Sequence, residues 1–151
     1  MVTVVVDVAN VMGSRPDGWW RDRAGAAARM HAAIARLAAS GRAALPDDTA
    51  LPDGRAVTPG VVLVLEGAAK AAPIPAEPGA GAEPDAADPV QPGEVRVIRA
   101  PGSGDDAIVA AVRALPGRRV VVTADRELRD RSVAAGATIL GPGWLLNLLN
   151  D

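Results

Sequence analysis

The chain has 151 residues, of which 49% are hydrophobic and 23% charged, and its net charge is −2 at pH 7. This is the size and balance of one globular domain over residues 1–151, and the charge argues against a uniformly basic nucleic-acid coat. The absence of cysteine excludes disulfides, thiolate metal sites and cysteine nucleophiles. No apolar run approaches the roughly 20 residues of a membrane helix, and no basic segment precedes the N-terminal apolar run, so we expect a cytoplasmic protein with no membrane partner.

Strand and helix patterns alternate along the chain. Five runs are nearly continuous in Val, Ile and Leu, as buried parallel strands are, and between them apolar residues recur every three or four positions, as in amphipathic helices. In chain order the predicted elements are a strand at Val2–Val6, a helix at Arg21–Ser40, strands at Val61–Leu65 and Glu94–Ile98, a helix at Asp105–Leu115, a strand at Arg118–Thr123, a helix at Arg126–Ala135, a strand at Ala137–Leu140 and a helix at Gly143–Leu149. The alternation predicts right-handed βαβ crossovers and therefore an α/β fold, a three-layer α/β/α sandwich around a mostly parallel five-stranded sheet.

Two segments interrupt this alternation. Residues 43–59 contain Pro46, Pro52 and Pro59 together with Asp-containing turns, a composition typical of a looping or hairpin insertion. Residues 71–93 are rich in Pro, Ala, Gly and acids and have almost no large apolar side chain. Because such a segment buries too little apolar surface to offset its ordering entropy, we expect a mobile loop there.

Acidic residues follow the predicted strands. Asp7 follows the first strand, Glu66 the second and Asp125 the fourth, while Asp105 and Asp106 begin the helix after the third. Ligands of open α/β sheets bind at the carboxyl ends of the strands, so these side chains occupy the informative positions. Taken singly, Asp105 or Asp125 could instead be a helix N-cap, which stabilises by about 1 kcal/mol without any chemistry.

As a set, the acids indicate a metal site. Carboxylates brought to one edge of a sheet repel one another and resist ionisation unless a cation lies among them. With no cysteine and a single histidine, the ligands must be oxygen atoms, which favours Mg²⁺ or Mn²⁺. Asn10, three positions after Asp7, then either orients that carboxylate or contacts a phosphate oxygen, unless it is an ordinary turn amide.

At this point the sequence resembles a known family. The segments DVANV, VLVLEG, SGDDAI and VTADRE resemble, in order, the motifs of PIN-like nucleases, in particular the NYN branch that includes YacP-like proteins. The resemblance implies metal-dependent hydrolysis of RNA phosphodiester bonds and a sheet ordered 3-2-1-4-5. It assigns catalysis to Asp7, Glu66, Asp105 and Asp125, metal binding to these four with Asp106, and an outer position to Glu127. Glu66 stands where the family pattern has an aspartate, and its extra methylene moves the carboxylate outward.

The segment GSRPDGWWRDR, residues 13–23, leaves the same edge of the predicted sheet directly after the first strand. Its arginines can bind phosphates and its tryptophans can stack on unpaired bases, each stack contributing about 1–3 kcal/mol. In the alternative interpretation one tryptophan fills the core and the arginines pair with Asp17 and Asp22. The predicted RNA contacts are Asn10, Arg15, Trp19, Trp20, Arg21, Arg23 and Arg126.

Other functions remain open from the sequence. A non-catalytic RNA-binding module with a degenerate site would use the same edge for phosphate contacts. The segment LVLEGAAK looks like the start of a Toprim domain, but that fold then needs Asp-x-Asp where this chain has Asp125-Arg126-Glu127. A phosphate-receiving regulatory domain would need an aspartate where Glu66 stands. Core packing is the preferred interpretation of the apolar C-terminal helix, and the alternative is that it serves a homodimer. Because the basic residues are few, a protein partner could deliver the single-stranded or structured RNA.

Overall fold

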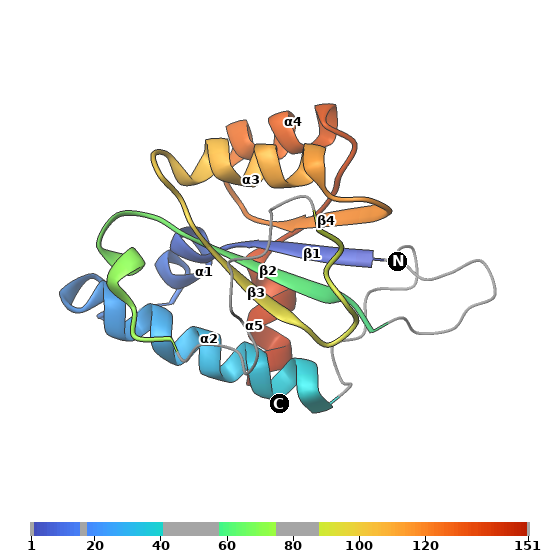
Figure 1. The fold of residues 1–151 in the computed structure, drawn as a ribbon. Helices are drawn as coiled ribbons and strands as arrows, with labels where there is room; N and C mark the ends of the chain where they lie inside the picture. Colours follow the sequence, from blue (N-terminus) through green and yellow to red (C-terminus); the bar gives the residue numbers. More distant parts are fainter. Residues whose placement is uncertain (1, 16–17, 41–57, 75–87, 151) are drawn as a thin grey trace.

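The structure, a computed structural model, describes residues 2–15, 18–40, 58–74 and 88–150. Its centre is one sheet of five parallel strands in the order β3-β2-β1-β4-β5 (Figure 1). The strands are β1 (Val2–Asp7), β2 (Gly60–Leu65), β3 (Val95–Arg99), β4 (Arg118–Val122) and β5 (Thr138–Leu140). Both the α/β class and the strand order expected from the sequence are confirmed.

Helices cover both faces of this sheet. One face carries α1 (Val8–Gly13), α2 (Arg23–Ser40) and α5 (Pro142–Leu149), and the other carries α3 (Gly104–Ala114) and α4 (Arg126–Ala134), as Figure 1 shows. Two short 3₁₀ turns, η1 (Trp19–Arg21) and η3 (Gly67–Ala71), follow α1 and β2. The result is the three-layer sandwich that the alternation of strands and helices predicts.

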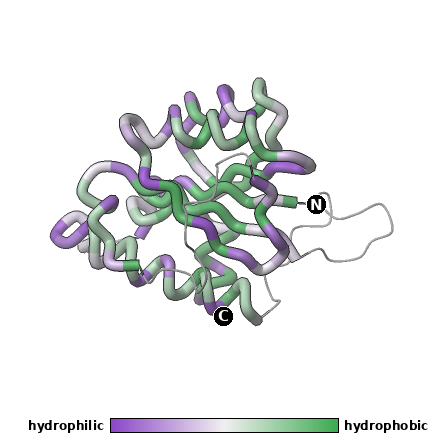
Figure 2. Tube along the Cα trace, viewed as in Figure 1, coloured by the Kyte–Doolittle hydropathy of each residue, from purple (hydrophilic) through white to green (hydrophobic). Residues whose placement is uncertain are grey.

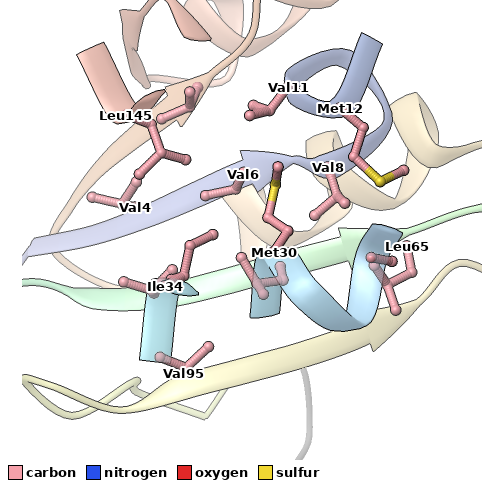
Figure 3. Packing of buried hydrophobic residues seen from close by; sticks show 14 of the residues in the cluster. Val4, Val6, Val8, Val11, Met12, Met30, Ile34, Leu65, Val95 and Leu145 are labelled. Carbon is pink, nitrogen blue, oxygen red and sulfur yellow. The ribbon is translucent and has the colours of Figure 1, made fainter. Parts of the chain in front are cut away.

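The central strand β1 is buried along its whole length and contributes to a core on each side. Val4 and Val6 pack with Ile34 of α2 and Leu145 of α5 in one core (Figure 3), whereas Val5 belongs to the core under α3 and α4. Successive side chains of a strand point to opposite faces, so a strand covered on both faces must be continuously apolar. Figure 2 shows this as hydrophobic strands in the middle and helices with hydrophilic outer segments.

Three helices, α3, α4 and α5, match expectation to within one residue at each end, and the helices differ from it by more in two places. The six-residue helix α1 begins directly after β1 and was not predicted, because its apolar residues continue the apolar run of the strand. The helix expected from Arg21 begins at Arg23, because the main chain first forms the separate turn η1. Asp22 marks the new start, where its Oδ1 accepts a hydrogen bond from the Gly25 N–H at 2.9 Å.

The two interrupting segments lie largely outside the described residues. Of the predicted insertion at 43–59, the structure describes only 58–59, and of the predicted loop at 71–93 it describes the two ends, 71–74 and 88–93. These ends are packed, since Ala72 and Val90 are buried. Val90 lies so close to Gly60 that a Cβ there would be 2.6 Å from Val90 Cγ1, which explains a glycine in β2.

The C-terminal helix α5 packs on the core of the domain. Leu145 is buried, and Trp144, Leu146, Leu148 and Leu149 are partly buried against the same cluster as Ile34. No helix among the described residues is both long enough and apolar enough to span a membrane.

Candidate acidic site at the carboxyl edge of the sheet

The structure brings the predicted acids to one edge of the sheet. Asp7 is the last residue of β1, Glu66 directly follows β2, and Asp125 is the N-cap of α4 after β4. Asp105 lies in the first turn of α3. Because β1 lies between β2 and β4, the buried Asp7 is at the middle of this group, which we call the acidic site.

Asp7 is buried and is held by two hydrogen bonds. The residue is 7% exposed. The Thr123 hydroxyl donates a hydrogen bond to Oδ2 of Asp7 at 3.0 Å, and the Asn10 N–H donates one to Oδ1 at 3.3 Å. Both bonds favour the ionised carboxylate, but burial outweighs them and raises the pKa of Asp7 from 3.8 to about 6. The neighbouring charges of Asp105 and Glu66 raise this pKa further.

Asn10 and Thr123 join the β1–α1 junction to the loop that follows β4. The Asn10 Oδ1 accepts a hydrogen bond from the Ala124 N–H at 2.8 Å, and the Thr123 Oγ1 accepts one from the Asp125 N–H at 3.1 Å. Asn10 thus orients Asp7 through its backbone and ties the two loops through its side chain. Thr123 was missed as a site residue, although its place two residues before Asp125 is the pattern of a side-chain turn.

The two aspartates that could be helix caps differ in the structure. Asp125 is an N-cap, because its Oδ1 accepts from the Leu128 N–H at 2.9 Å. Asp105 is not one, because the N-cap of α3 is Ser103, whose hydroxyl accepts from the Asp106 N–H at 3.3 Å. Asp105 accepts no hydrogen bond from the described residues, and partial burial, followed by the charges of Asp125 and Glu66, raises its pKa.

Glu66 reaches across to the helix that follows β3. Its Oε2 accepts a hydrogen bond from the Gly104 N–H at 2.7 Å. A Cβ on Gly104 would lie 2.6 Å from this oxygen, so the contact depends on a glycine at that position.

The outer acids lie away from this group. Asp106 is exposed and pairs with Arg131 of α4 at 2.8 Å, and Glu127 is exposed in the first turn of α4. Within the described ranges, no three His, Asp or Glu side chains already stand close enough together to hold a metal ion. The donor set itself suits Mg²⁺ or Mn²⁺, because it consists of carboxylates, and the charge of Glu66 raises the pKa of both Asp7 and Asp105.

The segment after α1 forms a small aromatic and cationic cluster. The Trp19 and Trp20 rings meet edge to face with centroids 6.2 Å apart, and the guanidinium groups of Arg21 and Arg23 lie 5.8 Å and 5.2 Å from the centres of the Trp20 and Trp19 rings, respectively. Trp19 packs partly against the core, as the alternative interpretation expected of one tryptophan, while Trp20 is 54% exposed.

The structure also describes the predicted RNA contacts Arg15 and Arg126. Arg15 is half-buried just after α1, and Arg126 is exposed at the first position of α4, next to Asp125. The proposed partner Asp17 lies outside the described residues, and Asp22 caps α2 through Gly25. Of the described arginines of the segment, Arg21 and Arg23 lie over tryptophan rings.

Comparison with known proteins gives one informative likeness. No family model matches the chain, and no curated protein matches it. Among solved structures, the crystal structure of Rae1 (YacP) from Bacillus subtilis, in its W164L mutant, superposes with a TM-score of 0.54 at 15% sequence identity, over 99% of this chain and 76% of that one. The chain has a YacP-like fold.

The sequence motifs and the YacP-like fold agree. The motifs around Asp7 and Asp125 resemble YacP-like proteins, and the chain shares its fold with Rae1 (YacP). At this level of identity the likeness shows the fold alone.

Proposed function

We propose that this protein is a metal-dependent ribonuclease that hydrolyses RNA phosphodiester bonds at the acidic site. The observation that carries the proposal is the buried Asp7 carboxylate, whose pKa is raised to about 6 beside the charges of Asp105 and Glu66. An ionised group in such a position destabilises the fold unless a cation lies next to it. Clusters of this kind, at the carboxyl edge of an α/β sheet, are typical of functional sites.

Asp7, Asp105 and Asp125 would hold the metal, Mg²⁺ or Mn²⁺. When bound, the metal would polarise the scissile phosphate and lower the pKa of a water molecule. The chain contributes positioning: Thr123 and the Asn10 backbone fix both oxygens of Asp7, and Asp105, which accepts no hydrogen bond from the described residues, keeps its lone pairs for a ligand. No side-chain nucleophile is required.

The aromatic and cationic cluster is the proposed RNA contact. Trp20 offers an exposed ring for stacking on an unpaired base, and Arg21 and Arg23 supply charge beside it. Arg15, just after α1, and Arg126, next to Asp125, add positive charge, so that single-stranded RNA would contact the protein at both its bases and its phosphates.

The test is cleavage of end-labelled single-stranded and structured RNAs with Mn²⁺, with Mg²⁺ and with chelator. We expect cutting only with metal, and loss of cutting in Asp7→Asn, while Asp130→Asn, which changes an exposed acid on α4, cuts like the wild type. Among the described residues, no three acidic side chains stand close enough together to hold a metal ion. A non-catalytic RNA-binding module is therefore the second candidate. It would shift RNA in a gel with chelator present and cut nothing in any metal.

A further inference from the structure

We propose that Glu66 is a positioning residue that holds the N-terminus of α3 at the acidic site, and is not a metal ligand. The proposal rests on the proposed function, in which Asp105 of α3 binds the metal. It departs from the motif resemblance, which assigns Glu66 to catalysis and metal binding with the three aspartates.

The first observation is the hydrogen bond between Glu66 Oε2 and the Gly104 N–H at 2.7 Å. The first N–H groups of a helix have no partner within the helix, and the helix dipole makes this end partly positive. A carboxylate is therefore a strong acceptor there. Ser103 satisfies the Asp106 N–H of the same turn, so Glu66 and Ser103 together cap the turn that carries Asp105.

The second observation is the glycine at position 104. Gly104 is not among the glycines with positive φ, so its backbone conformation does not require glycine. In a helix, alanine is more stable than glycine by about 1 kcal/mol. A side chain here would displace the Glu66 carboxylate from the Gly104 N–H, since a Cβ would lie 2.6 Å from Oε2 and 2.8 Å from the carboxyl carbon.

The third observation is the length of the side chain. Glutamate exceeds aspartate by one methylene, about 1.5 Å of reach. The hydrogen bond is 2.7 Å long, so an aspartate with the same backbone would leave the Gly104 N–H without its acceptor. The glutamate that departs from the motif pattern is thus the residue that this contact requires.

The consequence is a division of roles between the two acids. Asp105 directly follows the capped residue and accepts no hydrogen bond from the described residues, so its position depends on Glu66 while its oxygens remain available. Glu66 Oε2 joins two separate elements, since it accepts from the Gly104 N–H 38 positions away, whereas the cap formed by Asp125 lies at the start of its own helix. Moving Oε2 of Glu66 onto a metal would release the Gly104 N–H and leave Ser103 as the remaining described cap of the turn that carries Asp105.

The experiment compares Glu66→Gln with Glu66→Asp, because the two roles predict opposite orders. Glutamine keeps the length and an acceptor oxygen but loses the charge, whereas aspartate keeps the charge but loses the reach. For a positioning residue, we expect Glu66→Gln to bind Mn²⁺ within about threefold of the wild type, to retain RNA cleavage, and to keep the Gly104 amide protected from hydrogen exchange. In Glu66→Asp, the Gly104 amide should exchange about tenfold faster, because one hydrogen bond is lost. This variant should also cleave RNA more slowly than the wild type.

A ligand role would reverse this order. If Glu66→Gln loses Mn²⁺ affinity in calorimetry as severely as Asp105→Asn does, while Glu66→Asp retains it, the proposal is wrong. The calorimetry is repeated with Asp130→Asn as the matched control, since that variant removes one exposed charge from α4.

A second comparison requires neither metal nor RNA. Gly104→Ala should lower the melting temperature of the wild type, because the new Cβ crowds Glu66, but should raise it in a Glu66→Ala background, where only helix propensity remains. Equal effects in both backgrounds would refute the contact. If the wild type neither binds Mn²⁺ nor cuts RNA, the proposed function fails, and amide exchange together with this cycle still decides the role of Glu66.

Discussion

Replacing Asp7 by asparagine should stabilise the protein while abolishing its proposed activity. Asp7 is 7% exposed, and burial raises the pKa of its carboxyl group from 3.8 to about 6. That difference corresponds to about 3 kcal/mol of stability lost when the group is ionised. Asparagine has the same shape and no charge. The free energy of unfolding should therefore rise by nearly this value, reduced by the weaker hydrogen bonds of a neutral group.

The hydrogen bonds of Asp7 can be kept by the amide. Its Oδ1 would accept from the Asn10 N–H, and its Nδ2 would donate to the Thr123 hydroxyl, which still accepts from the Asp125 N–H. We therefore expect a net gain of about 1–3 kcal/mol at pH 8, and roughly 2–4 °C in melting temperature for each kcal/mol.

The gain should depend on pH in a defined direction. Because the pKa of Asp7 is raised on folding, the folded state binds the proton more tightly than the unfolded chain does. The penalty is complete above about pH 6 and disappears as the pH falls toward 3.8. Relative to the wild type, Asp7→Asn should thus be more stable at pH 8 and nearly equal at pH 4.

The assay is urea unfolding followed by circular dichroism from pH 4 to pH 8, with chelator present. Asp130→Asn serves as the control and should track the wild type at every pH. A constant loss of stability in Asp7→Asn across this range would show that the carboxylate is a structural anchor and would refute the reasoning from burial.

Three further predictions concern Thr123, the two neighbouring tryptophans and the metal ion. Thr123→Val removes the hydroxyl that donates to Asp7 and accepts from the Asp125 N–H; urea unfolding should show a loss of about 1–3 kcal/mol, larger than that of Thr123→Ser. Trp20→Ala should weaken binding of single-stranded RNA roughly 5- to 150-fold in fluorescence anisotropy with unchanged melting temperature, whereas Trp19→Ala should lower the melting temperature because Trp19 packs on the core. Adding Mn²⁺ should raise the melting temperature of the wild type and not that of Asp7→Asn, so an equal rise in both would place the ion elsewhere.

Much of the fold could be predicted because its strands are buried on both faces. Such strands are continuously apolar, so runs like Val61–Leu65 were evident from composition alone. The same property concealed α1: Val8, Val11 and Met12 are spaced for a helix, but they directly continue the apolar run of β1. A helix of six residues is too short for its periodicity to be separated from the strand before it.

The place of Asp7, Glu66, Asp105 and Asp125 at one edge of the sheet could be predicted, whereas the contacts among the loops there could not. Strand ends identified Asp7 and Asp125, because parallel strands bring their carboxyl ends to one edge. The bond from Ala124 to Asn10 spans 114 positions and that from Gly104 to Glu66 spans 38. Contacts of this kind depend on which loops become neighbours in space and on side-chain length to within one methylene group. Local sequence patterns indicate neither of these.

The central position of β1 has a consequence for synthesis of the chain. Its hydrogen-bonded neighbours are β2 and β4, and the Asp7–Thr123 contact spans 116 positions. At about 5–20 residues per second, a ribosome needs roughly 6–23 s to make that intervening chain. During this time β1, which is buried along its whole length in the folded protein, has no β4 to pair with, so one edge of this apolar strand stays uncovered in the nascent chain.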